Sequence, residues 1–391
     1  MDKVRIGDVC EILNGYAFKS ENYVSSGIRV IRIANVQKGY VEDSTPAFYP
    51  LESKGLEKYM LEEGDLLMSL TGNVGRVALL EKDMLPAALN QRVACLRLKS
   101  NAVLKKFLFH FLNSDYFEKQ CIQSSKGVAQ KNMSTEWLKD YEIPLFSLER
   151  QAEIVDILDS ITTIVNTKKQ QIAKLDELIK SRFVELFGDP ETNPNNWEIT
   201  KIGKLIESCE AGWSGNGTQR QKLPGEIAVL KVSAVTKGFF VPEECKVLDN
   251  QSEIKKYVFP QKGDLLFSRA NTREMVGATA VILQDYPELI LPDKLWKIRF
   301  ASCANVLYMK HILSHQSIRA KFSEASTGTS GSMFNVSMEK FKAIEIPLPP
   351  LELQNAFASF VKQTDKSKVA IQKSLDEMQV LYDKLMQEYF R

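Results

Sequence analysis

The chain has 391 residues, of which 44% are hydrophobic and 26% are charged, and its formal net charge is +2. This composition is typical of a globular protein with room for two domains, and the near-neutral charge means that any basic patch must be local. No run approaches the roughly 18 consecutive apolar residues of a membrane span, the N-terminus lacks the apolar core of a signal peptide, and six scattered cysteines favour reduced thiols over disulfides or a zinc site. We therefore expect a cytoplasmic protein that does not contact a membrane.

Residues 1–146 are predicted to form a first globular module of mixed α and β structure. Short β-branched and apolar runs between turn signals indicate strands, and two segments have helical spacing. The strands are expected at residues 29–33, 65–69 and 92–98, and the helices at residues 105–113 and 134–139.

A long helix is predicted over residues 147–187. Its apolar side chains recur at alternating spacings of three and four residues, which is the pattern of a coiled-coil seam, and about 40 residues at 1.5 Å each give a helix of roughly 60 Å. Gly188 and Pro190 end this helix, and residues 188–196 form a polar linker. The expected seam residues are Ile154, Leu158, Ile161, Val165, Ile172, Leu175, Ile179 and Leu186.

The second half of the chain repeats the first. Gly64 begins a Gly-Asp-Leu-Leu segment that returns at Gly263, 199 residues later, and the Ile-Pro-Leu segment at Ile143 returns at Ile346, 203 residues later. A period this long indicates duplication of a whole domain and not a solenoid, whose units have about 20 to 50 residues.

Residues 197–349 are accordingly a second module, with strands expected at 229–232, 264–268 and 296–300. Residues 350–391 form a second long helix. The seam residues expected in it are Phe357, Val361, Ile371, Leu375, Met378, Tyr382, Leu385 and Tyr389.

Together these elements predict an α+β fold with two tandem mixed α/β domains separated by two long helices. Each helix needs a partner for its apolar seam, and the other helix of the same chain is the nearest one. Antiparallel pairing would form a coiled coil, place the two modules at its opposite ends and relate the two halves by a pseudo-twofold axis. Such an arrangement would act as a ruler.

The sequence contains no recognisable catalytic constellation. It has no Gly-x-x-x-x-Gly-Lys-Ser/Thr phosphate loop and no Asp/Asn-Pro-Pro-aromatic segment of an amino-methyltransferase. His311 and His315 are four residues apart, but a third metal ligand is missing, so we expect no metal site. Asp65 and Asp264 each follow a glycine before a strand, and we expect both carboxylates to cap turns.

The order of these pieces resembles the specificity subunit of Type I restriction–modification systems. The resemblance covers essentially the whole chain, and it rests on both Gly-Asp-Leu-Leu-x-Ser segments, on residues 127–134, and on the segments that begin and end the helices, at 143–151, 346–354 and 175–189. The second module departs from the family pattern at residues 328–335 and 269–273. Divergence between modules is what two different target sequences would require.

The resemblance implies that each module is a target-recognition domain that reads one half of a split, asymmetric double-stranded DNA site, and that the coiled coil sets the spacer. It also implies that this chain is not itself an enzyme. Its partners would be two modification (methyltransferase) subunits, which methylate adenine, and restriction (motor–nuclease) subunits. S-adenosylmethionine, ATP and Mg would be used by those partners, with no cofactor bound by this chain.

Candidate DNA-binding residues are long hydrogen-bond donors on loops, because Arg reads guanine, Asn and Gln read adenine, and Lys holds phosphate. An ordinary solvated loop position is the alternative for each of them. Tyr16 and Phe18 could stack near bases, although core packing is favoured. The candidates in the first module are Asn73, Arg76, Asn90, Gln91, Arg92, Lys126, Gln130, Lys131 and Asn132, and those in the second are Arg220, Lys222, Arg269, Asn271, Arg273, Thr329, Ser330 and Asn335.

Two other functions are left open by the sequence. The chain could be a scaffold that uses two adhesive modules to space protein partners without DNA. It could also be an enzyme of the restriction class with its own methylation or nuclease site, which the missing motifs argue against. A salt-dependent affinity for duplex DNA separates the first alternative from a DNA-reading subunit, because phosphate contacts release counterions.

Overall fold

The computed structural model describes residues 2–125, 132–250, 252, 254–328 and 334–390. The chain divides into two compact units, one made of residues 1–170 and 372–391 and the other of residues 171–371. The main strands and helices follow the same order in both units, and the second unit adds the short strands β12, β16, β20 and β21, so the predicted α+β fold with two duplicated mixed modules and two long helices is confirmed.

In the first unit, a four-stranded antiparallel sheet has the order β2-β8-β5-β6, and a smaller sheet has the order β4-β3-β7 with β3 and β7 parallel. Strand β1 pairs with β9. The strands are β1 (Asp2–Arg5), β2 (Cys10–Asn14), β3 (Ile28–Ile31), β4 (Phe48–Tyr49), β5 (Leu66–Ser69), β6 (Val77–Leu79), β7 (Ala87–Leu89), β8 (Val93–Leu98) and β9 (Glu142–Leu145). The helices are α1 (Ile6–Val9), α2 (Lys105–Leu112), α3 (Asp115–Ser124), α4 (Thr135–Asp140) and the start of α5 (Leu148–Phe187).

The second unit repeats this plan with the sheet order β11-β19-β15-β17 and a second sheet β12-β14-β13-β18, in which β13 and β18 are parallel. The strands are β10 (Glu198–Lys201), β11 (Ile206–Ala211), β12 (Gly217–Thr218), β13 (Ala228–Leu230), β14 (Cys245–Leu248), β15 (Leu265–Ser268), β16 (Ala270–Asn271), β17 (Thr279–Val281), β18 (Leu289–Ile290), β19 (Leu295–Phe300), β20 (Thr327–Gly328), β21 (Phe334–Asn335) and β22 (Glu345–Leu348). The helices are α6 (Val306–Ser314), α7 (Gln316–Ala325), α8 (Met338–Ala343) and the start of α9 (Leu351–Phe390).

The Gly-Asp-Leu-Leu segments form the central strands β5 and β15, which are buried on both faces. Leu66 belongs to the core beside the helices, whereas Leu67 faces the core beneath the smaller sheet. Leu265 and Leu266 divide in the same way. A strand covered on both faces is rich in apolar residues, which explains why the first three positions of each strand are all apolar and do not alternate with polar ones.

Asp65 and Asp264 fix the turn that precedes each central strand, as the sequence predicted. The Asp65 carboxylate accepts the Glu62 backbone N–H at 2.8 Å, and the Asp264 carboxylate accepts that of Gln261 at 2.7 Å. Each carboxylate is also paired with an arginine of the neighbouring strand: Arg97 Nε donates at 2.9 Å, and Arg299 Nε at 2.7 Å. The pairing with Asp65 raises the pKa of Arg97.

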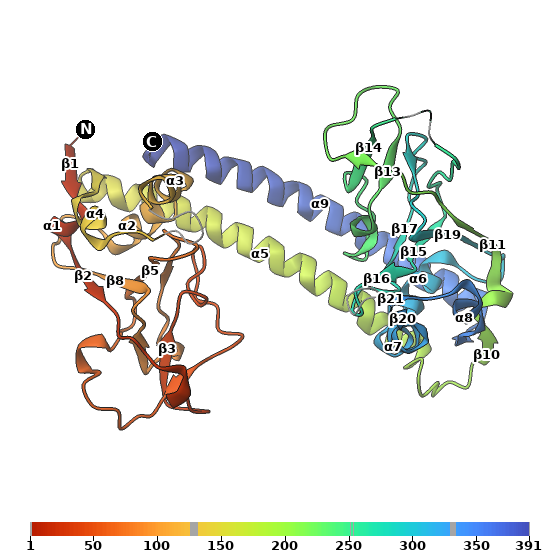
Figure 1. Ribbon diagram of the computed structural model, residues 1–391, viewed down its shortest axis with the longest axis horizontal. Coiled ribbons are helices and arrows are strands. Elements are labelled where there is room, and N and C mark those ends of the chain that lie inside the picture. Colours follow the sequence, from red (N-terminus) through yellow and green to blue (C-terminus); the bar gives the residue numbers. More distant parts are fainter. Residues whose placement is uncertain (1, 126–131, 251, 253, 329–333, 391) are drawn as a thin grey trace. The chain divides into compact units, whose positions relative to one another are not determined.

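The long helices α5 and α9 pack antiparallel within each unit (Figure 1). In the first unit, Ile154 and Leu158 share a core with Met386 and Phe390. In the second unit, Lys368 Nζ donates to the Asp176 carboxylate at 2.5 Å. Residues early in one helix therefore meet residues late in the other, and the predicted antiparallel coiled coil is confirmed.

The seam positions expected from the sequence are all at least partly buried. Eight of them are fully buried: Ile154, Leu158, Ile161, Val165, Ile179, Phe357, Val361 and Leu375. The others are half-buried: Ile172, Leu175, Leu186, Ile371, Met378, Tyr382, Leu385 and Tyr389.

In the last two turns of each helix, the most buried side chains lie one position beyond the expected seam. They are Phe183 and Phe187 in α5 and Met386 and Phe390 in α9. Phe183 stacks on Tyr308 of α6 at a ring-centroid distance of 5.9 Å, so it packs against the module as well as against the other helix. Contact with a globular domain widens the buried stripe beyond a two-helix seam, which the strict spacing does not anticipate.

A buried glutamine anchors the start of each long helix. Gln151 is fully buried; its Oε1 accepts the Leu104 N–H at 2.8 Å, and its Nε2 donates to the carbonyls of Ala102 and Phe146, both at 2.9 Å. Gln354 does the same in the second unit with the N–H of Asn305 and the carbonyls of Cys303 and Pro349. The side chains complete backbone groups that would otherwise be unpaired.

Some sequence-based boundaries were wrong. The strand expected to reach residue 232 ends at Leu230, and a 3-10 turn, η5 (Val232–Val235), follows it. Helices α3 and α7 were not predicted. Both begin with a side-chain cap: Ser114 Oγ accepts the Phe117 N–H at 3.1 Å, and His315 Nδ1 accepts the Ser317 N–H at 3.4 Å.

Candidate nucleic-acid interface

Three loops meet at the end of the central strand β5. The Leu70 N–H donates to the Arg92 carbonyl at 3.0 Å, and the Leu70 carbonyl accepts the Met133 N–H at 2.9 Å. Thr71 also forms an isolated antiparallel bridge with Asn132. Residue 70 therefore joins the loop after β5 to the loop before β8 and to the segment before α4. We call this junction the β5 edge.

Asn73 and Arg76 lie in the turn between β5 and β6, next to the β5 edge. The carbonyl of Asn73 accepts a hydrogen bond from Ser69 Oγ, and its side chain is exposed. Arg76 is half-buried, and its guanidinium donates to the Gln37 side chain. Asn73 is thus available to a ligand, while Arg76 is oriented by a partner within the unit.

Asn90, Gln91 and Arg92 form the second loop at this edge. Together with residues 32–34 they line a surface hollow of about 290 Å³. Gln91 and Arg92 have exposed side chains, and Asn90 Oδ1 accepts the Arg92 N–H at 3.3 Å. A hollow with a guanidinium and an amide at its rim can accept a polar, anionic ligand.

The two aromatic residues near this loop have different environments. Phe18 packs in an edge-to-face contact with Tyr49 at a centroid distance of 4.8 Å, as core packing predicts. Tyr16 is 39% exposed, and its backbone is bonded to the same loop: its N–H donates to the Leu89 carbonyl at 2.8 Å and its carbonyl accepts the Gln91 N–H at 2.9 Å. Tyr16 therefore lies at the β5 edge.

The equivalent strand β15 ends in an equivalent junction, which we call the β15 edge. The Arg269 N–H donates to the Lys294 carbonyl at 3.1 Å, and the Arg269 carbonyl accepts the Val336 N–H at 2.9 Å. Strand β16 pairs with β21 so that Ala270 lies opposite Asn335. The predicted residues 269, 271, 273 and 335 are brought together here.

Three polar side chains of the β15 edge, those of Arg269, Asn271 and Arg273, are held by neighbours. Arg269 Nε donates to the Asp293 carbonyl at 2.8 Å. The Arg273 guanidinium lies over the Phe334 ring, 5.5 Å from its centroid, and Asn271 Nδ2 donates to Ser268 Oγ at 3.4 Å. These contacts orient the side chains in advance, which lowers the entropic cost of binding a ligand.

Two further candidates of the second unit are engaged in ion pairs. Arg220 donates from both terminal nitrogens to the Glu226 carboxylate, at 2.8 and 2.6 Å, and this pairing lowers the pKa of Glu226 to about 2. Lys222 Nζ lies 3.2 Å from the Glu288 carboxylate. Neither residue takes part in the backbone junction that forms the β15 edge.

Five candidates lie outside the described residues. They are Lys126, Gln130, Lys131, Thr329 and Ser330.

The histidines fill structural positions. His110 is buried, and its Nε2 lies 2.8 Å from the Asp159 carboxylate of α5. Burial lowers the pKa of His110, which the contact with Asp159 offsets only in part. His311 packs edge-on against Phe357. Within the described ranges, no group of three or more His, Cys, Asp or Glu side chains could hold a metal ion.

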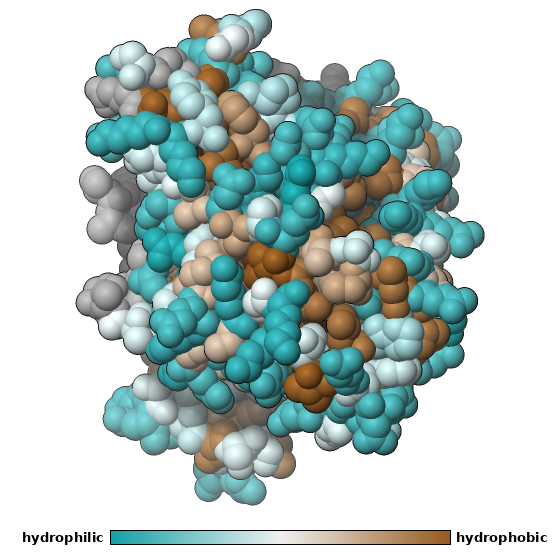
Figure 2. Space-filling view, turned by 90° about the vertical axis from the view of Figure 1, so that its right-hand side faces the viewer, coloured by the Kyte–Doolittle hydropathy of each residue, from teal (hydrophilic) through white to brown (hydrophobic). Residues whose placement is uncertain are grey.

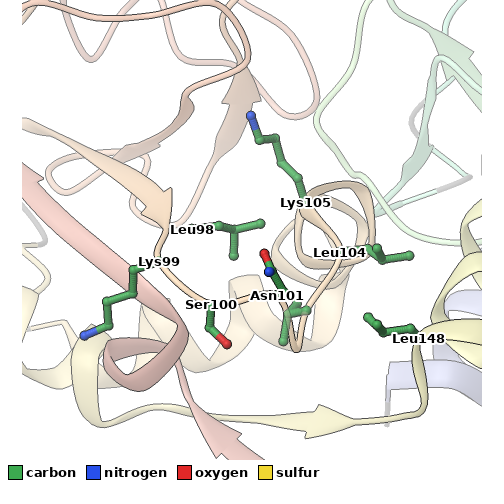
Figure 3. Close-up of a pocket in the computed structure, with 8 residues that line it drawn as sticks. Leu98, Lys99, Ser100, Asn101, Leu104, Lys105 and Leu148 are labelled. Carbon is green, nitrogen blue, oxygen red and sulfur yellow. The ribbon is translucent and has the colours of Figure 1, made fainter.

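The units have other surface features besides the two edges. A hollow of about 540 Å³ lies beside the start of α2 and of α5, and Lys99, Asn101 and Lys105 are among its lining residues (Figure 3). In the face shown in Figure 2, hydrophilic side chains surround separate small hydrophobic areas. No helix among the described residues has the length and apolarity that crossing a membrane requires.

Sequence reasoning missed Lys294 and Trp213, which occupy the β15 edge. The Trp213 N–H donates to the Leu291 carbonyl at 2.9 Å, as Tyr16 does to Leu89, so the two aromatics are equivalent. The internal repeat is the signal that could have identified them. Trp213 follows a glycine as Tyr16 does, and Lys294 directly precedes a strand as Arg92 does.

Comparison with known proteins supplies the family of this fold. The family model described as Type I restriction modification DNA specificity domain matches residues 1–177 and 194–378. The specificity subunit of the type I restriction enzyme MjaVIII from Methanocaldococcus jannaschii is 30% identical over 184 residues, which cover 45% of this chain and 43% of that subunit. The chain thus aligns with less than half of that relative's length.

Two other similarities extend over nearly the whole chain. The specificity subunit of the type I restriction enzyme EcoKI from Escherichia coli is 22% identical over 383 residues, which cover 92% of this chain and 80% of that subunit. The crystal structure of a Type-I restriction-modification system S subunit from M. genitalium matches with a TM-score of 0.58 at 14% identity, over 100% of this chain and 96% of that one. At this identity the structural match concerns the fold.

Proposed function

The chain belongs to the family of Type I restriction modification DNA specificity domains, and from this premise we propose that it reads DNA sequence for a type I restriction–modification complex. Each unit contacts one half of a split, asymmetric site on double-stranded DNA. The observation that carries the proposal is the duplicated edge: the same backbone junction ends β5 and β15, but it presents different side chains in the two units.

The chemistry of the edges suits DNA. Exposed Gln91 and Arg92 at one edge, and Arg269 and Arg273 at the other, supply the amide and guanidinium donors that read base edges and bind phosphates. Both edges also place an aromatic side chain beside the polar loop. Backbone donors and charged groups gathered at loop ends on a rigid sheet are the usual arrangement of a binding site.

We further propose that α5 and α9 set the spacer between the half-sites. Each helix has 40 residues and therefore a length of about 60 Å. Each also continues from one compact unit into the other. Since a packed pair of helices resists bending and stretching, it can fix the separation of two binding edges.

The catalytic steps belong, in this proposal, to partner proteins. Two modification subunits would use S-adenosylmethionine to methylate adenine, and restriction subunits would use ATP and Mg to cleave unmodified DNA. This chain would bind none of these cofactors and would act in the cytoplasm as the non-catalytic, sequence-reading subunit. The name of the matched family supports the role in DNA specificity.

The test is to express the chain with a candidate modification subunit and map methylated bases across a genome. We expect one bipartite motif, and exchange of residues 1–146 for the module of a relative should change only one half of it. The competing scaffold function predicts no motif and a weak affinity for duplex DNA that does not fall steeply with salt. Methylation by the purified chain alone would contradict a non-catalytic role.

A further inference from the structure

The two edges can be aligned residue by residue from their backbone hydrogen bonds, without using sequence similarity. Leu70 and Arg269 are equivalent, because each donates to the residue before its next long strand and accepts from a residue before α4 or α8. The accepted N–H groups belong to Met133 and Val336. The residues that directly precede them, Asn132 and Asn335, therefore occupy the same place in the fold.

The cross-strand partners confirm this equivalence. Asn132 bridges Thr71, and Asn335 lies opposite Ala270 in the β16–β21 pair. The residue opposite the asparagine thus differs between the units, and so does the residue that forms the junction, which is Leu70 in the first unit and Arg269 in the second. The asparagine is identical in both units.

Neither asparagine has an evident structural task. Asparagines with such a task in this protein use their amides: Asn35 accepts the Arg32 N–H at 3.0 Å and donates to the Glu42 carbonyl at 2.7 Å. By contrast, no side-chain hydrogen bond of Asn132 or Asn335 is found within the part of the chain that the structure describes. Asn132 is exposed and Asn335 partly exposed, so both amides are open to a ligand.

A cation accompanies each asparagine. The carbonyls of Arg92 and Lys294 accept the N–H groups of residues 70 and 269, so these two residues are equivalent as well. Within the described ranges, neither side chain forms an ion pair. Each edge therefore combines a free carboxamide with a free cation, which are the groups that contact a base and the neighbouring phosphate.

We propose that Asn132 and Asn335 are equivalent base-contacting residues, each of which recognises one adenine of its own half-site in the major groove. This inference rests on the proposed function. A carboxamide can donate to N7 and accept from the N6 amino group of adenine at the same time, and no other base offers that pair in the major groove. Arg92 and Lys294 bind phosphate beside the recognised base.

The inference is tested with the full chain and a library of duplexes randomised over the length of a bipartite site. Bound duplexes are sequenced for the parent, N132A, N132D and N335A. N132A should lose discrimination at one A·T position of one half-site by about 5- to 150-fold, the range of one bidentate contact. N335A should do the same at one position of the other half-site. N132D should shift the preference at its position towards cytosine, because a carboxylate accepts from the C N4 amino group.

Controls separate this inference from the function on which it rests. N101A changes an exposed asparagine of the first unit that lines the hollow of Figure 3, and it should leave the motif unchanged. R92A should weaken binding at every sequence and lower the salt dependence by about one released counterion. If the parent selects no motif, the proposed function fails. If the parent selects a bipartite motif that N132A and N335A leave intact, or the relaxed position is not A·T, only the inference fails.

Discussion

Removal of one buried glutamine should weaken one unit selectively. Gln151 is fully buried and makes three side-chain hydrogen bonds, all between 2.8 and 2.9 Å, to backbone groups at the start of α2 and α5. In Q151A one N–H and two carbonyls lose their partner. A net contribution of about 1 kcal/mol for each bond, plus the cost of the groups left unpaired, gives a loss of about 3–5 kcal/mol of unfolding free energy.

The size of this effect makes it measurable in the full chain. For units of this size, about 1 kcal/mol corresponds to a shift of roughly 2–4 °C in melting temperature, so the transition of the first unit should fall by about 6–20 °C. Hydrogen exchange read by mass spectrometry should show faster exchange in α2 and in the start of α5. The helix α6 of the second unit should exchange at its parental rate.

The chain provides its own matched control. Q354A removes the equivalent contacts in the second unit, to Asn305, Cys303 and Pro349, and should accelerate exchange in α6 but not in α2. The same Gln-to-Ala substitution should therefore accelerate hydrogen exchange in α2 when it is made at Gln151 and in α6 when it is made at Gln354. A loss of less than about 1 kcal/mol, or equal acceleration in both units, would refute the reasoning that the amide anchors its own module.

Two further predictions concern the second unit and the long helices. Burial, and to a smaller extent the charges of Lys310 and Lys368, hold the pKa of His311 well below its usual range. The neutral imidazole therefore contributes its full stability to the fold above about pH 6.5, and this contribution is lost as the pH falls. In H311F the free energy of unfolding, measured by urea denaturation, should fall less steeply as the pH is lowered. A pH dependence equal to that of the parent would contradict this role of His311. Four residues inserted after Lys169 lengthen α5 by roughly 6 Å and should widen the methylated spacer by about one or two base pairs, whereas an unchanged spacer with retained activity would mean that the helices do not set the distance.

The order of elements was predictable because the second half of the sequence repeats the first, so that each half could be checked against the other. The repeat of Gly64 at Gly263, and of Ile143 at Ile346, located both modules and both helices. Periodicity located the antiparallel seam, since a helix with one apolar stripe has to bury it. The caps of α3 and α7 were present in the sequence as Ser114 and His315, but histidine is an unusual cap and the signal is weak.

The candidate interface was less predictable, because it depends on contacts between distant loops. Nothing in the spacing shows that Leu70 is bonded to both Arg92 and Met133, or that Arg220 is neutralised by Glu226. Long donors on loops look alike in a sequence. A side chain that is free to contact DNA and one that is held by a carboxylate differ only in the folded protein.

The duplication also distinguishes residues that maintain the fold from residues that contact a ligand. Gln151 and Gln354, like Asp65 and Asp264, are identical and buried, and their hydrogen bonds explain why both copies keep them. Residues at the edges differ because two half-sites of different sequence require different contacts. An identical residue that is exposed and unpaired fits neither group. It is best explained by a feature that both half-sites share, and Asn132 with its counterpart in the second unit meets that description.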